Sequence, residues 1–274
     1  MDLPIQLIST DFDGTLHAEG ETPAVPEAIE TCLRHLQARG TQWVVNTGRD
    51  LAGVLAALER AHLSIQPDFL VVVEREIFYR QGRHYLGLID WNQRCQRDHE
   101  ILFARVRPLV PVLADWINAR FTAQVYDDPY SPFCLMARSN ADADLILEHV
   151  QQFCQTIPGL TVVRNDVWAR FSHAAYNKGT ALGEILRQVS VGRDQVLAAG
   201  DHWNDLPMLS TEFARWLVAP ANAVEAVKAA VRRQNGYVSS EPGGLGVARG
   251  IAHFLQTLEA AGPFPAVASV GPMD

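Results

Sequence analysis

The feature that most constrains the fold is an alternation of short apolar stretches with helical patterns early in the chain. Predominantly apolar runs at 5–8, 42–45 and 69–73 have the length of strands. Between them lie two segments with apolar residues at helical spacing. One begins at Pro26, and the other ends near His62 and follows Asp50, which can cap its N-terminus. Strands that alternate with helices in this way form parallel sheets. We therefore predict the α/β class, with a doubly wound, mainly parallel sheet.

A different pattern interrupts this alternation in the middle of the chain. The expected strands there come in adjacent pairs, such as 121–126 and 132–137, and helical patterns lie beside them. Adjacent pairs are typical of antiparallel sheets that are covered on one face. We predict an inserted α+β domain at 84–165 and a discontinuous core domain at 1–83 and 166–274.

The alternating pattern resumes after the insertion. Expected strands at 167–171, 195–199 and 216–219 would return to the core sheet. Asn177 and Asn222 precede helical patterns and are residue types that cap helix N-termini. We therefore expect both halves of the core to contribute strands to one sheet.

The composition is that of an ordinary globular protein, with 48% hydrophobic and 20% charged residues. A formal net charge of -8 argues against a nucleic-acid partner. The 4 cysteines are widely spaced and form no metal-type pair, which favours free thiols in a reducing compartment. We find no leader-like segment, and no apolar run approaches the roughly 18 residues of a membrane span. We expect a cytoplasmic protein without membrane partners, and the sequence does not indicate an oligomeric state.

Two carboxylates stand where the first strand ends. Asp11 and Asp13 are two residues apart, so on a strand they point to the same face. Gly14 follows and lets the chain leave the strand by backbone angles that most residues avoid. Two carboxylates in one space repel unless a cation lies between them, and a hard divalent metal prefers oxygen ligands. The alternative is a polar strand end followed by an ordinary turn.

Further polar residues follow other strands or begin a helix of the parallel unit. They are Thr47 and Gly48, Lys178, and the group Asp201, Asn204 and Asp205. In open α/β sheets, ligands lie beyond the carboxyl ends of the strands, so these clusters should converge. Carboxylates at 11, 13 and 201 could share one Mg²⁺, and Lys178 could hold a phosphate oxygen. This combination predicts phosphoryl transfer.

These clusters resemble the four motifs of the haloacid dehalogenase-like (HAD) phosphatases, in family order. The matching stretches are Asp11-Phe12-Asp13-Gly14-Thr15, Thr47-Gly48-Arg49, Asn177-Lys178-Gly179 and Gly200-Asp201-x-x-Asn204-Asp205. The length and place of the insertion resemble the large α/β cap of the Cof-type and sucrose-phosphatase-like branch. The resemblance implies a HAD-like core and a Mg²⁺-dependent phosphatase that acts on a small phosphorylated metabolite, with sugar phosphates among the candidates.

The resemblance also implies a role for each motif residue. Asp11 would be the nucleophile that forms an aspartyl phosphate, and Asp13 the general acid and base. Mg²⁺ would be held by Asp11, the Asp13 carbonyl and Asp201. Asp205 would bind the ion directly or through water, or would support the residues that bind it. The phosphoryl group would contact the remaining residues, which are Thr47, Gly48, Lys178 and Asn204.

Two stretches depart from the family pattern. His202-Trp203 stands where relatives often carry a small residue, and it could crowd the mouth of the site. Glu74-Arg75-Glu76 stands where many relatives have Asn-Gly-Ala, near the start of the insertion. Substrate selectivity is expected from the insertion, with the turn Asp127–Tyr130 as a candidate.

Three other functions remain open at this point. A phosphomutase of the same superfamily would return the phosphoryl group to a sugar instead of passing it to water. A signalling receiver domain also takes phosphate on an aspartate, but receivers are shorter and lack an insertion of this size. A ligand-sensing relative without hydrolytic activity is the third alternative.

Overall fold

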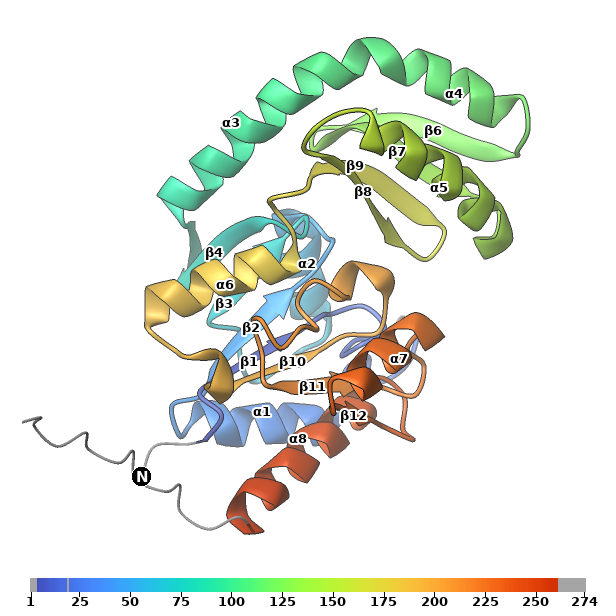
Figure 1. Ribbon diagram of the computed structural model, residues 1–274. Helices are drawn as coiled ribbons and strands as arrows, with labels where there is room; N and C mark the ends of the chain where they lie inside the picture. Colours follow the sequence, from blue (N-terminus) through green and yellow to red (C-terminus); the bar gives the residue numbers. More distant parts are fainter. Residues whose placement is uncertain (1–3, 19, 261–274) are drawn as a thin grey trace, which may run out of the picture.

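The computed structural model describes residues 4–18 and 20–260, and Figure 1 shows a unit on a smaller sheet lying over a unit on a larger one. The strands of the larger sheet are β1 (Leu7–Thr10), β2 (Gln42–Asn46), β3 (Phe69–Val72), β4 (Glu76–Gln81), β5 (His84–Gly87), β10 (Val196–Ala199), β11 (Trp216–Ala219) and β12 (Tyr237–Val238). Their order across the sheet is β12-β11-β10-β1-β2-β3-β4-β5. Neighbours from β12 to β3 pair parallel, and β4 and β5 extend the sheet antiparallel. The predicted α/β class with a mainly parallel sheet is confirmed.

Helices cover both faces of this sheet because its strands are apolar on both faces. The helices are α1 (Glu27–Gln37), α2 (Leu51–Arg60), α6 (Lys178–Val189), α7 (Glu225–Arg233) and α8 (Gly243–Ala260). Ile8 of β1 packs in one hydrophobic cluster with α1, α2 and α8, and its neighbour Leu7 packs in the other with α6 and α7. The alternation of side chains along each strand therefore fills both layers.

The smaller sheet belongs to a segment that we call the inserted unit, residues 89–173. It contains α3 (Ile89–Val106), a 3-10 turn η1 (Arg107–Leu109), α4 (Val110–Asn118), β6 (Ala123–Asp128), β7 (Ser131–Ala137), α5 (Asn140–Gln155), β8 (Leu160–Asn165) and β9 (Trp168–His173). The strand order is β6-β7-β9-β8, and all pairs are antiparallel. Phe133 and Leu135 of β7 pack against the helices, while Cys134 between them lines a cavity on the opposite face. One face of the sheet is therefore covered by helices and the other faces the larger unit (Figure 1).

The structure corrects the placement of two strands. We expected 167–171 in the parallel sheet, but β9 pairs antiparallel with β7 and β8. The reason is a tight turn at Asp166, with φ 53, which makes β8 and β9 a hairpin, whereas a parallel pairing needs a long crossover. In the same way β5, expected in the insertion, is the hairpin partner of β4 in the larger sheet. The division into two domains stays a prediction.

The expected helix caps were correct except at Asn222. Asp50 caps α2 by accepting from the Gly53 amide, and Asn177 caps α6. Asn222 does not cap α7, which begins at Glu225. Its amide instead donates to the Gly14 carbonyl at 2.8 Å, and its oxygen accepts from the Gly243 amide at 2.7 Å. Asn222 thus connects the start of α8 to the loop after β1.

Candidate functional site

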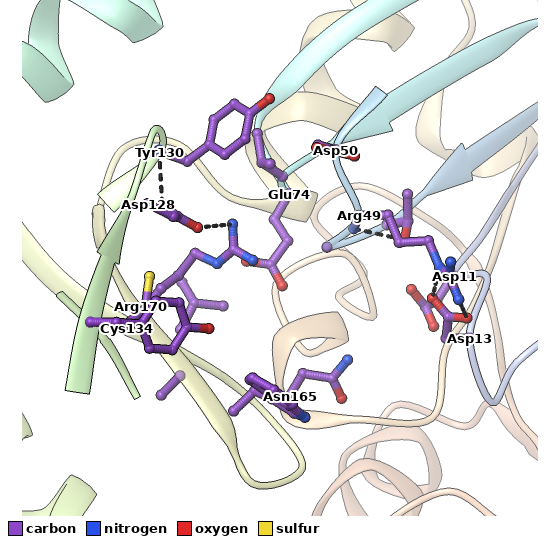
Figure 2. Close-up of a pocket in the computed structure, with 17 residues that line it drawn as sticks. Asp11, Asp13, Arg49, Asp50, Glu74, Asp128, Tyr130, Cys134, Asn165 and Arg170 are labelled. Carbon is purple, nitrogen blue, oxygen red and sulfur yellow. Dashed lines mark hydrogen bonds and ion pairs between the residues drawn. The ribbon is translucent and has the colours of Figure 1, made fainter. Parts of the chain in front are cut away.

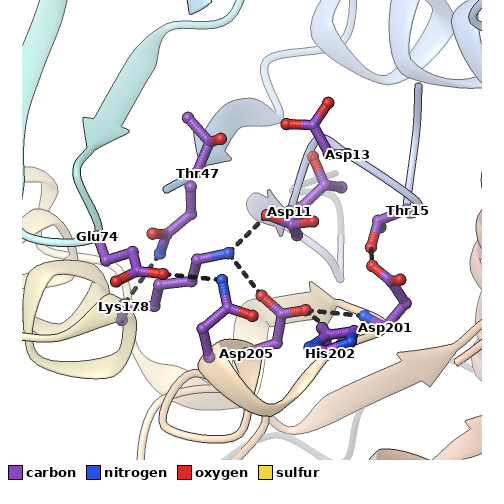
Figure 3. A network of polar contacts seen from close by, with 12 residues as sticks. Asp11, Asp13, Thr15, Thr47, Glu74, Lys178, Asp201, His202 and Asp205 are labelled. Atoms are coloured by element: carbon purple, nitrogen blue, oxygen red, sulfur yellow. Dashed lines mark hydrogen bonds and ion pairs between the residues drawn. The ribbon is translucent and has the colours of Figure 1, made fainter. Parts of the chain in front are cut away.

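The polar clusters of the sequence converge at the carboxyl ends of three adjacent parallel strands. Asp11 and Asp13 follow β1, Thr47 follows β2, and Asp201 follows β10. Lys178 begins α6 and points toward the same place (Figure 3). The order of the strands, with β1 between β2 and β10, is what gathers residues that are far apart in the sequence.

Lys178 forms the centre of the charge network. Its Nζ lies 2.5 Å from Asp11 Oδ1 and 2.6 Å from Asp205 Oδ1, and the side chain is fully buried. Burial acts to lower the pKa of Lys178, but the charges of Asp11, Asp205 and Glu74 outweigh burial and raise that pKa above its ordinary value. The ammonium group therefore stays charged at neutral pH.

The carboxylates of this network outnumber the one ammonium group among them. Oxygens of Asp11, Asp201 and Asp205 lie within 4.8 Å of one another, and all three residues are buried. Burial, and next the charge of Asp205, raise the pKa of Asp11 well above its ordinary range and that of Asp201 to about 7. The excess negative charge and the all-oxygen donor set fit a hard divalent cation such as Mg²⁺.

Asp205 holds the loop after β10 in place. Its Oδ2 accepts the backbone amides of Asp201 at 2.8 Å and His202 at 2.9 Å, while Oδ1 takes the Lys178 ammonium. Both oxygens are thus engaged by the protein. This geometry favours an indirect role for Asp205 over direct metal ligation.

Three residues near Asp201 were given no site role by the sequence reasoning. Thr15 donates its hydroxyl to Asp201 Oδ1 at 2.6 Å, and Asn222 Nδ2 lies 3.5 Å from Asp201 Oδ2. Gly14, with φ +78, leaves room for the same carboxylate, because a Cβ there would lie 2.5 Å from Asp201 Oδ2. Thr15 could have been found from its place in the first motif, whereas the contact of Asn222 depends on the tertiary fold.

Asp13 faces away from this network and is held by Arg49. The guanidinium donates from Nε and Nη2 to the two oxygens of Asp13, at 2.7 Å each. The Arg49 amide also donates to Thr47 Oγ1 at 3.2 Å. The loop after β2 thus contacts the first motif through an ion pair, and it presents Thr47 and Gly48 beside Asp13.

A cavity of about 340 Å³ opens above these residues, between the larger unit and the inserted unit (Figure 2). Its floor comes from the larger unit and includes Asp11, Asp13, Thr47, Gly48 and Glu74. Its roof comes from the inserted unit and includes Tyr126, Asp128, Tyr130, Asn165, Trp168 and Arg170. From the candidate turn Asp127–Tyr130, therefore, Asp128 and Tyr130 reach this cavity. Carboxylate, guanidinium and aromatic side chains together suit a polar ligand with hydrogen-bonding groups.

Asn204 lies to the side of this floor. Its Nδ2 donates to Glu74 Oε1 at 2.8 Å, and its Oδ1 is buried with no hydrogen-bond partner among the residues that the structure describes. Together with Lys178 it lines a second cavity, of about 410 Å³. The residues predicted to hold a phosphoryl group are therefore divided between two adjoining cavities.

His202 and Trp203 contact the inserted unit. The Asp166 amide donates to the His202 ring, 3.1 Å from Nδ1, and the Arg164 guanidinium lies 4.0 Å from the centroid of the Trp203 ring. Trp203 belongs to a 3-10 turn, η3 (Trp203–Asp205). The two side chains thus connect η3 to the β8–β9 hairpin.

Comparisons with known proteins agree with this fold. Residues 120–245 match the family model of the haloacid dehalogenase-like hydrolases. The sucrose-phosphatase of Synechocystis sp. PCC6803, solved with sucrose and phosphate, is 19% identical with a TM-score of 0.68, over 91% of this chain and 98% of that one. A putative HAD/COF-like hydrolase from Plasmodium vivax is 18% identical with a TM-score of 0.63, over 94% and 96%. The HAD fold that the resemblance implied is confirmed.

One curated protein is similar over part of its length. The chain is 25% identical over 257 residues to the chloroplastic endoribonuclease YBEY of Arabidopsis thaliana, which covers 81% of this chain and 42% of that protein. The chain therefore spans less than half the length of this relative. The endoribonuclease activity is that of the longer protein, as its name states, and is not assigned to this chain. Within residues 4–18 and 20–260, no helix is long and apolar enough to cross a membrane.

Proposed function

We propose that this chain is a Mg²⁺-dependent phosphatase that hydrolyses a small phosphomonoester, with sugar phosphates as the first candidates. One observation carries the proposal. Asp11 contacts Lys178 on one side, and on the other it opens with Asp13 into the cavity below the inserted unit. A buried carboxylate beside a cation, with a second carboxylate at the cavity, is an arrangement suited to a nucleophile with an acid and base nearby.

In the proposed reaction, an Asp11 oxygen bonds to phosphorus while the bond from phosphorus to the ester oxygen breaks. Asp13 gives a proton to the departing alcohol. Asp13 then accepts a proton from the water that attacks the aspartyl phosphate, which releases phosphate and restores the Asp11 carboxylate. Because Arg49 pairs with both oxygens of Asp13, that ion pair must open when substrate binds.

Asp11, Asp201 and the Asp13 carbonyl would hold Mg²⁺, with Asp205 acting through water or through the loop that it supports. A bound Mg²⁺ supplies positive charge that stabilises the negative charge of the phosphoryl oxygens. Thr47, Gly48 and Lys178 would contact the same oxygens, and Asn204 would assist from the second cavity. Lys178 remains charged in its buried position and is therefore suited to this role.

The proposed substrate class rests on the cavity and on the relatives. The roof offers Asp128, Asn165 and Arg170 as hydrogen-bonding groups and Trp168 as an aromatic face. Such a lining suits the hydroxyl groups and ring of a sugar. We further propose a reducing, cytosolic location, since all 4 cysteines are free and 3 of them are buried.

The proposal is tested by phosphate release from a panel of phosphomonoesters, with Mg²⁺ and with EDTA. We expect Asp11→Asn to lower kcat by roughly a thousandfold or more, because the nucleophile is lost. Asp13→Asn should lose most turnover and keep Mg²⁺ affinity, since its carbonyl remains, whereas Asp201→Asn should lose Mg²⁺ affinity. The exposed Asp90→Asn is the matched control.

Normal turnover by Asp11→Asn would contradict the assignment of the nucleophile. Equal loss of Mg²⁺ affinity in Asp13→Asn and Asp201→Asn would contradict the division of roles between the carboxylates. Recovery of an isomerised sugar phosphate, in place of free phosphate, would identify a phosphomutase instead.

A further inference from the structure

We infer that Glu74 is a specificity-determining residue, whose side chain divides the site and limits the size of the substrate that can bind. This inference rests on the proposed function of the same site. It concerns the stretch Glu74-Arg75-Glu76, which departs from the family pattern and takes no part in the proposed chemistry.

Glu74 stands where the two cavities meet. The first cavity measures about 340 Å³ and the second about 410 Å³. Among the described residues, Glu74 and Val163 line both of them. Glu74 comes from the turn after β3, and Val163 from β8 of the inserted unit. The wall between the cavities is therefore built from both units.

The side chain of Glu74 is fixed across this junction. It is 7% exposed, and its Oε1 accepts from Asn204 Nδ2 at 2.8 Å. On the other side, a Cβ added to Gly48 would meet the same oxygen at 3.3 Å. Figures 2 and 3 show Glu74 from the two sides, next to the first cavity and next to Lys178. The carboxylate thus reaches from the loop after β2 to η3.

The backbone below this side chain is held in place. Val73 has φ 42 and Glu74 has φ 66, both in the left-handed region that few side chains adopt. The Val73 amide donates to the Arg49 carbonyl at 2.8 Å, and the Glu74 amide donates to the Thr47 carbonyl at 2.9 Å. The turn is therefore tied to the loop that carries Thr47 and Gly48. Because the backbone of this turn is held, the opening between the two cavities can widen only if the Glu74 side chain moves or is removed.

The position of Glu74 has two consequences for a substrate. The phosphoryl group of the substrate would lie beside Glu74. The reason is that the two residues proposed to contact that group lie in different cavities, Gly48 in the first and Lys178 in the second. A compact leaving group fits the first cavity alone, whereas a larger one must extend past the wall. The carboxylate also repels a second anionic group. We therefore assign to this site compact phosphomonoesters, of about one sugar ring, with no second negative charge.

Four variants separate the size of the wall from its charge. Glu74→Gly removes the side chain and suits the positive φ, and Val163→Ala trims the wall from the inserted unit. Glu74→Gln keeps the size and removes the charge. Glu59→Gln is the matched control, because this exposed carboxylate on α2 lines neither cavity. Each variant is combined with Asp11→Asn, so that binding is measured without turnover.

The experiment is calorimetry in Mg²⁺ with orthophosphate, glucose 6-phosphate and sucrose 6-phosphate. We expect Glu74→Gly to improve the affinity for sucrose 6-phosphate, relative to glucose 6-phosphate, by about tenfold. Val163→Ala should shift the ratio in the same direction by less. Glu74→Gln should change all affinities by a common factor, and Glu59→Gln should leave the ratio unchanged. An unchanged ratio in both Glu74→Gly and Val163→Ala would overturn the inference.

The outcome for Glu74 can be distinguished from the outcome for the proposed function. If the variants shift the binding ratio but the unmodified chain releases no phosphate from any ester, the role of Glu74 is supported and the proposed phosphatase function is refuted. If the chain hydrolyses esters and the ratio does not move, the phosphatase stands and the wall is refuted. Failure of all three phosphates to bind would refute both.

Discussion

Gly14 affects both the path of the backbone and the position of a carboxylate in the site. Its positive φ turns the chain away from β1, and its missing Cβ makes room for the Asp201 carboxylate. The Gly14 carbonyl also accepts from Asn222, which ties the same turn to the start of α8. Backbone conformation and carboxylate position are therefore determined at one residue.

We predict that Gly14→Ala displaces Asp201 and lowers Mg²⁺ affinity and turnover by about tenfold or more, because the new methyl group would overlap the carboxylate. Mg²⁺ titration followed by calorimetry, together with phosphate release, measures the effect. The matched control is Gly82→Ala in the β4–β5 turn, where φ is +63 and nothing lies within 4 Å of a new Cβ. It should cost roughly 1 kcal/mol of folding stability and keep turnover. Equal Mg²⁺ affinity in the two variants would contradict the prediction.

The sequence was most informative for residues whose position follows from strand ends. Asp11, Thr47 and Asp201 could be placed together because parallel strands end at one edge of the sheet. Contacts between loops could not be predicted, since they depend on how separate loops pack. The ion pair of Arg49 with Asp13 and the hydrogen bond of Asn204 to Glu74 are of this kind.

At the scale of elements, η3 and the β8–β9 hairpin form a contact between the two units. Arg164 lies over the Trp203 ring, and the turn residue Asp166 donates its amide to His202. A cation over an aromatic face contributes about 1 kcal/mol at a partly exposed site. The bulky pair 202–203 therefore holds the hairpin against the larger unit.

We predict that Trp203→Ser frees the hairpin, so that amides of residues 160–173 exchange hydrogen about fivefold faster. Hydrogen exchange followed by mass spectrometry measures this directly. Trp203→Phe keeps a ring below Arg164 and should retain most of the protection. Equal protection in the serine variant and the unmodified chain would show that the ring does not hold the hairpin.

Elements were predictable where the pattern was local. The alternation of strands and helices, with Asp50 and Asn177 as caps, was visible in the sequence. Sheet membership was not local for β9. A strand that is apolar on alternate residues fits either sheet, and only the tight turn at Asp166 directs it back along β8. The strand β12, of 2 residues, is too short to give a pattern.

At the scale of the whole molecule, His99 connects the first helix of the inserted unit to its last strand. Its Nδ1 donates to the Cys95 carbonyl at 2.7 Å within α3, and its Nε2 accepts the His173 amide at 3.0 Å at the end of β9. These bonds require a neutral ring. Burial, and next the charge of Arg75, lower the pKa of His99 to about 3.

This lowered pKa gives a pH dependence with a definite sign. The unfolded chain takes up the proton near pH 6.5, before the folded one, so the stabilisation is complete above that pH and is lost as pH falls toward 3. By pH 5 we expect the loss to reach roughly 2 kcal/mol. His99→Gln should therefore be destabilised less at pH 5 than at pH 8, by about that difference.

Urea unfolding at the two pH values measures the effect of this substitution. His35→Gln, at an exposed position on α1, is the control and should show no such difference. If His99→Gln were destabilised equally at both pH values, the neutral buried ring would not be the source of the pH dependence.

The chain enters and leaves the inserted unit at a single joint. Trp91, just after the entry, packs edge-on against Tyr176, just after the exit, with ring centroids 5.2 Å apart. The Tyr176 hydroxyl also donates to Asp98 at 2.6 Å. None of the strands of the larger sheet lies within the inserted unit. Residues 89–173 could therefore be replaced as one piece without interrupting any strand of the sheet whose ends carry the carboxylates.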